Sequence, residues 1–98
     1  MNTKIQSIKF NADQKLLAFA EEKVGKLDKF FDGIVSAEIA MRVENVSDEK
    51  NKVVKILLEV PGSALFAENK CKSFEEAIDL DVEVLKKQLA KYKERLRE

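Results

Sequence analysis

Basic side chains are concentrated near the end of the chain, in a stretch with the spacing of a helix. Positions 86–97 hold six bases and the single acid Glu94, whereas positions 73–85 hold five acids and no base. This polarity complements a helix dipole, but the dipole accounts for only a charge or two at each end. The surplus of bases is therefore a candidate binding site for phosphate groups. The alternative interpretation is that these bases form an ordinary solvated face of the helix. The six bases are Lys86, Lys87, Lys91, Lys93, Arg95 and Arg97.

Other reactive groups are scarce. The chain has no histidine and one cysteine, Cys71, so zinc sites and Ser-His or Cys-His catalysis lack their parts. The carboxylates of Asp79, Asp81 and Glu83 could form an acid/base or metal cluster, but helical spacing sends residues 79 and 81 to different faces. No phosphate-binding glycine loop appears. We therefore predict a protein that is not an enzyme and that uses no metal or cofactor.

Length and composition bound the class of protein. The 98 residues suffice for one domain, residues 1–98. The 18 basic and 18 acidic residues cancel, which excludes a uniformly basic arm but not charge sorted onto separate faces. No apolar run approaches the roughly 20 residues of a membrane span, and the N-terminus lacks the apolar core of a signal peptide. With a single cysteine, these features predict a cytoplasmic protein without a membrane partner.

Hydrophobic periodicity predicts the order β-α-β-β-β-α. Gly33 is the expected stop of the first helix in a left-handed conformation, and Ser73 with Glu76 has the spacing of a capping box. Consecutive strands joined by short turns predict an antiparallel meander, and the first strand should pair in parallel after its helical crossover. The predicted fold class is α+β, a two-layer sandwich of a four-stranded mixed sheet with two helices packed on one face. Strands are expected over 4–10, 35–45, 52–60 and 64–72, and helices over 14–31 and 74–96.

Both predicted helices carry bases beside their apolar stripes. At 100° per residue, Lys86, Lys93 and Arg97 share one flank of the last helix. Its back and opposite flank carry Lys87, Lys91 and Arg95. If the helices pack side by side, their flanks could merge into one basic surface suited to the phosphates of nucleic acid. The first helix adds Lys15, Lys23, Lys26 and Lys29.

Two motifs stand on these helices. Residues 23–32 read KVGKLDKFFD, and residues 77–79 and 88–96 read AID and QLAKYKERL. The first is similar to K-x-x-K-L-x-x-[YF]-[FY]-D, and the second pair to A-I-D followed by Q-L-x-K-[YH]-K-x-[KR]-L. Both patterns, at this separation, are typical of the short ribosome hibernation promoting factors, also called the ribosome-associated inhibitor or sigma-54 modulation family. The chain resembles this family over essentially its whole length.

The resemblance implies a hibernation factor that inactivates translation in stationary phase or stress. It would bind the small ribosomal subunit and its rRNA in the channel between head and body, in competition with mRNA and with A- and P-site tRNA. We expect it to be monomeric off the ribosome, and to lack the C-terminal dimerisation domain of long members.

Val84 departs from the family, since many members have a basic residue there. The RNA-binding candidates carried over by position are Lys23, Lys26, Lys29, Lys87, Lys91, Lys93 and Arg95, with Lys86 added from the local charge cluster.

Two other functions fit the residues themselves. The order α-β-β-β-α after the first strand is also that of a general double-stranded RNA-binding module. The charged helices could instead make the domain a protein-binding scaffold with an acidic partner. Sequence-independent binding through phosphates needs lysines and arginines on a folded frame and no catalytic group.

Overall fold

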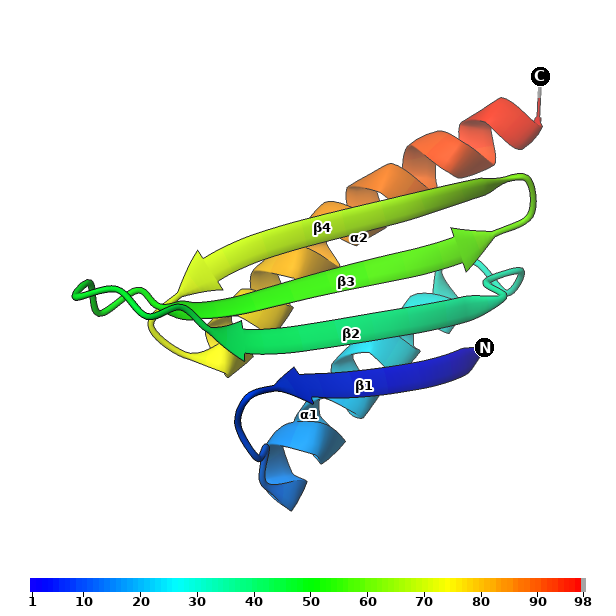
Figure 1. Ribbon diagram of the computed structural model, residues 1–98. Coiled ribbons are helices and arrows are strands. Elements are labelled where there is room, and N and C mark those ends of the chain that lie inside the picture. Colours follow the sequence, from blue (N-terminus) through cyan, green and yellow to red (C-terminus); the bar gives the residue numbers. More distant parts are fainter. Residues whose placement is uncertain (98) are drawn as a thin grey trace.

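The computed structural model describes residues 1–97 and has the predicted order of elements (Figure 1). The last residue of the expected domain, Glu98, lies outside the described residues. A two-layer arrangement accounts for the flat shape, which measures 47 × 24 × 18 Å along its principal axes. The elements are β1 (Asn2–Ile8), α1 (Gln14–Gly25), the 3-10 helix η1 (Lys26–Lys29), β2 (Ser36–Val43), β3 (Lys52–Val60), β4 (Ser63–Cys71) and α2 (Phe74–Leu96).

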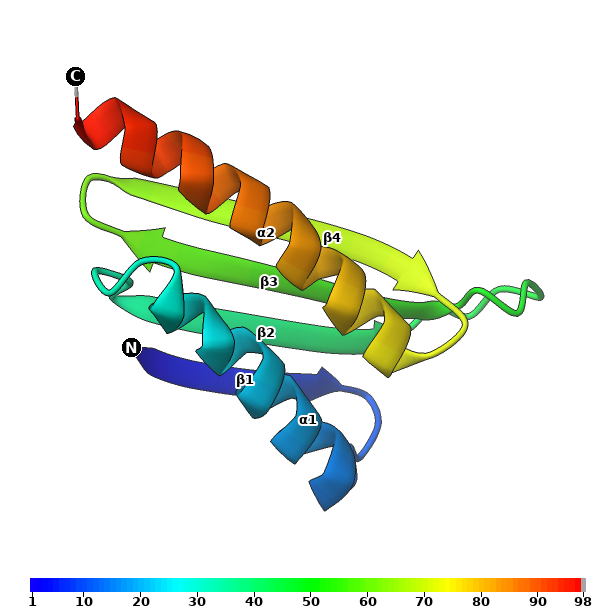
Figure 2. The ribbon, with the colours of Figure 1, turned by 180° about the vertical axis from the view of Figure 1, so that it is seen from behind.

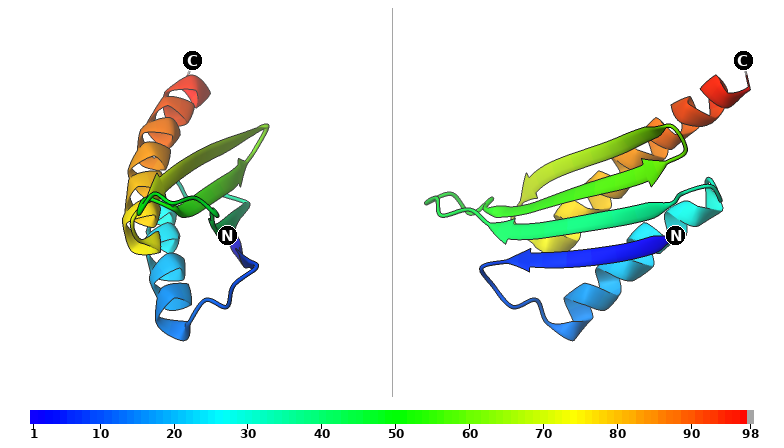
Figure 3. Two further views of the ribbon diagram at one scale, coloured as in Figure 1. Left: turned by 60° about the vertical axis from the view of Figure 1, so that its left-hand side comes forward. Right: turned by 45° about the vertical axis from the view of Figure 1, so that its right-hand side comes forward.

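The four strands form one mixed sheet in the order β1-β2-β3-β4. β1 pairs in parallel with β2, because α1 carries the chain back across the sheet between them. β2, β3 and β4 pair antiparallel through short connections, and Gly62 takes the positive φ of 75° that the β3–β4 turn requires. Both helices cover one face of the sheet and leave the other open (Figures 2 and 3). The predicted α+β two-layer sandwich is confirmed.

The core lies between the helices and the covered face of the sheet. Alternate residues of the two central strands point into it, as the period-2 pattern predicts. Stripes of residues three and four apart on the helices meet them from the other side. Buried members of this core include Ala37, Ile39, Met41, Val54, Ile56 and Leu58 from the sheet and Leu16, Ala20, Val24, Ile78, Leu85 and Leu89 from the helices.

The first helix is shorter than predicted. The α-helix expected over residues 14–31 ends at Gly25 and continues as η1, which keeps Leu27 fully buried. Gly33 does not take the expected left-handed conformation, since among residues 1–97 positive φ values occur at Lys9 and Gly62. The small size of Gly33 has another use: a Cβ there would lie 2.7 Å from a ring atom of Phe31. The prediction that the first helix stops at Gly33 was therefore wrong, because its last helical residue is Lys29.

The first strand is also displaced from its predicted range of 4–10. It covers residues 2–8 and ends where Lys9 takes a φ of 62°. This turn carries Phe10 out of the strand, so its ring stacks on Phe74 at the start of α2, with 4.9 Å between centroids. The predicted strand therefore begins and ends two residues later than the observed one.

None of the helices within residues 1–97 is long and apolar enough to cross a lipid bilayer.

Candidate nucleic-acid interface

The helix that carries most of the candidate bases is anchored from its first residue, Phe74, to Tyr92, one turn before its end. The Ser73 hydroxyl accepts a hydrogen bond from the Glu76 amide at 3.1 Å, which confirms the Ser73 half of the predicted capping box. Within residues 1–97, the reciprocal hydrogen bond from the Ser73 amide to the Glu76 carboxylate is not found. Ile78, Leu85, Leu89 and Tyr92 are buried against the sheet and against α1. Packing of this stripe leaves two flanks of α2 for polar side chains, one toward α1 and one toward the exposed edge of β4.

The inner flank consists of Lys86 and Lys93 of α2 and Lys23 of α1, which contact groups across the junction of the two helices. Lys93 Nζ donates to the backbone oxygen of Phe30 at 2.8 Å. Lys86 Nζ lies 5.2 Å from the centre of the same residue's ring and 3.3 Å from Glu83 Oε1. Lys23 Nζ lies 3.3 Å from Asp79 Oδ1 of α2. All three ammonium groups thus have partners inside the protein.

The two remaining candidates of the first helix lie farther from α2. Lys26 Nζ is 3.8 Å from Glu22 Oε1, one turn earlier on α1. Lys29 is exposed at the end of η1, and within residues 1–97 no carboxylate forms an ion pair with it. The structure therefore does not bring all the bases of the first helix together with those of α2.

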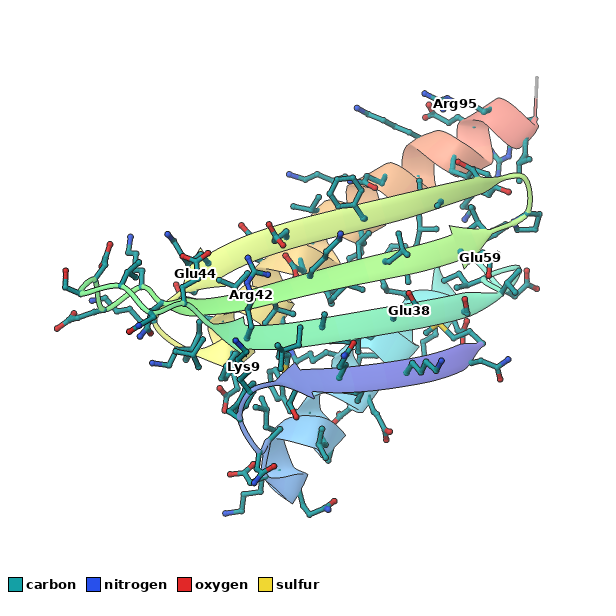
Figure 4. All side chains as sticks on the ribbon, in the orientation of Figure 1. Lys9, Glu38, Arg42, Glu44, Glu59 and Arg95 are labelled. Carbon is teal, nitrogen blue, oxygen red and sulfur yellow. The ribbon has the colours of Figure 1, made fainter. Side chains whose placement is uncertain are left out.

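The outer flank consists of Lys87, Lys91 and Arg95, which are all exposed. No carboxylate of the described residues forms an ion pair with any of them. Lys91 and Arg95 are four residues apart on the same face, where two like charges repel each other. The fold gains nothing from this pair, so an external anion would stabilise it. Figure 4 places Arg95 near the C-terminal end of α2.

A shallow hollow of about 220 Å³ separates this outer flank from the β3–β4 turn. Gln88 lies between the helix and the strand edge, where its side-chain amide donates to the backbone oxygen of Phe66 at 2.9 Å. Ser63 and Gln88 were not among the binding residues predicted from the sequence, since neither belongs to a charge cluster. The residues lining the hollow are Ser63, Leu65, Gln88, Lys91, Tyr92 and Arg95.

The open face of the sheet also carries bases, each close to an acid. Arg42 and Lys70 form ion pairs, whereas Lys4 and Lys55 form none within residues 1–97 but stand opposite Glu38 and Glu68 in the strand register. Arg42 contacts Glu44 Oε1 at 3.4 Å and Glu68 Oε2 at 3.5 Å. Lys70 contacts the other carboxylate oxygen of Glu44 at 3.3 Å. Glu38 lies on the same face (Figure 4). The helix layer, and within it the outer flank, is therefore the part of the surface best suited to phosphate groups.

The acids of α2 are separated as their spacing predicts. Asp79 is exposed and pairs with Lys23, whereas Asp81 is fully buried between α2 and β4. Asn69 Nδ2 donates to Asp81 Oδ1 at 2.7 Å, and Oδ2 has no hydrogen-bond partner among the described residues. Burial raises the pKa of Asp81 to about 7, with a smaller contribution from Glu68, while the hydrogen bond from Asn69 opposes the rise.

This separation leaves no paired carboxylates for acid/base chemistry in α2. Across residues 1–97 no group of three potential metal ligands comes together. Cys71 is buried, and burial raises the pKa of its thiol, helped by Glu76 and Asp81. A raised thiol pKa makes the reactive thiolate scarcer.

Comparison with known proteins gives a family match over almost the whole chain. Residues 3–97 match the model of the family described as sigma 54 modulation protein / S30EA ribosomal protein. A ribosome hibernation promoting factor from Azotobacter vinelandii is 30% identical over 95 residues, which cover 97% of this chain and 85% of the relative. A ribosome hibernation promotion factor from Deinococcus radiodurans is 36% identical over 78 residues, covering 79% of this chain. The match spans 41% of the Deinococcus radiodurans protein, so this chain corresponds to less than half of that relative.

Solved structures share the fold. A ribosomal subunit interface protein from Coxiella burnetii superposes with a TM-score of 0.83 at 22% identity, covering 95% of this chain and 98% of that one. The N-terminal domain of Protein Y from Thermus thermophilus gives a TM-score of 0.82 at 22% identity, covering 94% and 99%. The matched family is described as a ribosomal protein and a sigma 54 modulator, and not as an enzyme. The chain belongs to the sigma 54 modulation protein / S30EA ribosomal protein family.

Proposed function

We propose that the protein is a ribosome hibernation factor that binds the small ribosomal subunit and inactivates translation in stationary phase or stress. Its binding site there would be the channel for mRNA and for the A- and P-site tRNAs, where it would exclude these ligands. The names of its relatives support the hibernation role, and the description of the Coxiella burnetii structure supports a place at the subunit interface. The observation that carries the proposal is the outer flank, with three exposed bases on the long helix of a family member.

Charge and shape both suit rRNA as the ligand. Folded RNA is recognised largely by shape and backbone, which requires correctly placed cations and no catalytic group. The chain has no net charge, so a generally attractive field does not hold it to nucleic acid. Binding would depend instead on the local set Lys87, Lys91 and Arg95, together with Lys29. Lys23, Lys26, Lys86 and Lys93 would contribute less, because each already contacts a group of the protein.

Co-sedimentation on sucrose gradients tests this proposal. The protein is expected to migrate with isolated small subunits and with intact ribosomes at low salt, and to dissociate as salt rises. If three to four bases contact phosphates, affinity should fall by roughly 20- to 100-fold between 50 and 200 mM salt. Small subunits preloaded with mRNA and tRNA should bind less protein. A protein that remains at the top of the gradient at low salt would contradict the hibernation role.

A competition arm separates this function from a general double-stranded RNA-binding module. Excess duplex RNA of unrelated sequence is expected to leave the protein on the ribosome. Displacement by equimolar duplex would favour the general module instead. A matched gradient with large subunits alone distinguishes small-subunit binding from non-specific attraction to rRNA, which both subunits contain.

A further inference from the structure

The hollow beside the outer flank differs in charge from two hollows on the open face of the sheet. Its lining includes two cations, Lys91 and Arg95, and no carboxylate. The two hollows on the open face of the sheet, of about 440 and 250 Å³, each have Lys4 opposite Glu38. Of these three hollows, the one beside α2 therefore has the lining that favours an anion.

Four uncharged residues complete the lining, and all of them except Leu65 carry a side-chain hydrogen-bonding group: Ser63, Leu65, Gln88 and Tyr92. Ser63 opens β4 directly after the Pro61–Gly62 turn, and its hydroxyl can donate to an anion. Ser63 is exposed, and no hydrogen bond of its hydroxyl is found within residues 1–97. The hollow thus brings a serine of the sheet to two cations of α2, although they lie about thirty positions apart in the sequence.

Contacts between α2 and neighbouring segments hold the walls of the hollow in shape. The Tyr92 hydroxyl donates to the backbone oxygen of Pro61, which ties α2 to the turn that precedes Ser63. The ring of Tyr92 packs edge-on against Phe31, with 5.3 Å between centroids and 81° between planes. Gln88 holds the other side through Phe66. An anion entering this hollow would not have to organise its walls, and such preorganisation raises affinity.

We propose that this hollow holds a single phosphate group of the ribosomal RNA backbone. Arg95 would offer its planar guanidinium, Lys91 its compact positive charge, and Ser63 a hydroxyl donor. Such a mixture of charged and neutral donors is usual for phosphate oxygens. This inference rests on the proposed function and adds a specific claim to it: the RNA-binding surface extends beyond the helices onto the β3–β4 turn.

A serine-to-glutamate pair tests the claim. Ser63→Glu places a negative charge in the hollow, whereas Ser47→Glu makes the same change in the exposed β2–β3 connection at the opposite end of the sheet (Figure 1). Binding of each variant to isolated small subunits is measured across a salt series. We expect Ser63→Glu to weaken binding at least 30-fold and to reduce the salt slope by about one or more. Ser47→Glu should change affinity less than threefold, and Ser63→Ala should weaken it about three- to tenfold.

The outcomes separate this inference from the proposed function. If the unmodified protein and all serine variants bind equally, the hollow holds no phosphate and the hibernation role stands. If the unmodified protein does not bind at low salt, both proposals fail. A photo-crosslinker attached to Ser63→Cys gives a second measurement, because the native Cys71 is buried. It is expected to attach to rRNA, and attachment to ribosomal protein alone would overturn the assignment of a phosphate.

Discussion

The two flanks of α2 carry the same types of side chain and use them differently. On the inner flank, Lys86 and Lys93 contact the segment that ends the first helical region, and Lys23 pairs with Asp79. On the outer flank, Lys91 and Arg95 face a hollow that is free of carboxylates. A count of bases would treat both flanks as one basic surface. The contacts show that a cation's partners within the fold, and not its presence alone, indicate whether it is available for a ligand.

The largest effect is expected from reversing the outer flank. The triple change of Lys87, Lys91 and Arg95 to Glu should weaken small-subunit binding at least 100-fold, about 3 kcal/mol. It removes three cations from the proposed contact with phosphates and replaces them with repelling charges. Thermal unfolding should be nearly unchanged, since exposed charges contribute little to stability. Binding is measured by co-sedimentation, and stability by circular dichroism.

A control with the same change in net charge sharpens this comparison. Lys4, Lys9 and Lys50 are all exposed away from the helix layer, and all three can be changed to Glu. That variant is expected to retain binding within about fivefold. Equal losses in the two triple variants would show that net charge, and not the outer flank, controls binding.

A smaller effect, on stability alone, is expected from the buried face of α2. The pKa of Asp81 lies near 7 in the folded protein and near 3.8 when the chain unfolds, so the folded state binds the proton more tightly. The stabilisation from this proton is fully present below pH 4 and is lost as pH rises through 7. We expect the free energy of unfolding to fall by about 2.5 kcal/mol between pH 5 and pH 8. Urea unfolding at the two pH values measures this change.

Asp81→Asn should remove most of this pH dependence, because the amide stays neutral and can still accept from Asn69. At pH 8 the variant should be more stable than the unmodified protein. Its affinity for small subunits should be unchanged, since Asp81 lies on neither flank. The control is Asp79→Asn, whose carboxylate is exposed. An identical pH dependence in Asp81→Asn and in the unmodified protein would place the titration elsewhere.

The smallest effect is expected from the inner flank. Lys93→Met together with Lys23→Gln removes the hydrogen bond to Phe30 and the ion pair with Asp79. We expect a loss of about 1–2 kcal/mol in unfolding free energy, since a net hydrogen bond contributes about 1 kcal/mol and a partly exposed ion pair less. Small-subunit affinity should fall less than about tenfold. A larger loss of binding than in the outer-flank variant, without unfolding, would reverse the comparison.

Much of the fold could be predicted because each signal was local. The alternation in residues 36–43 and 52–60 and the Ser73 cap depend on near neighbours in the chain. The end of α1 could not be found in this way, because η1 keeps Leu27 buried and so continues the apolar spacing. The early end of β1 depends on a turn at Lys9, which has no marked sequence signal.

The division of the candidate bases of α2 between two flanks could be predicted, but their partners within the fold could not, and their binding of RNA stays a prediction. Helical spacing placed Lys86 and Lys93 on one flank and Lys91 and Arg95 on the other, in agreement with their contacts. It could not show that Lys93 binds a backbone oxygen 63 residues away, or that Ser63 and Arg95 line the same hollow. The burial of Asp81, in contrast, could be predicted from a pattern in the sequence.

That pattern is the position of Asp81, three residues after Ile78 and four before Leu85. Both of these neighbours belong to the apolar stripe. An acid at such a position is a candidate for burial with a raised pKa. The burial of Asp81 could therefore have been predicted from the spacing of the stripe.

The parallel pairing of β1 with β2 has a consequence for how the molecule opens. β1 is an edge strand, and the whole of α1 separates it from β2 along the chain, whereas β2, β3 and β4 pair with sequence neighbours. None of the residues of β1 is buried, and segments with few buried contacts open at a lower free energy than the core. Amide hydrogens of β1 should therefore exchange with solvent sooner than those of β3. Because α2 packs on β3 and β4, the outer flank would keep its shape through such local opening, so a partly frayed molecule would remain able to bind.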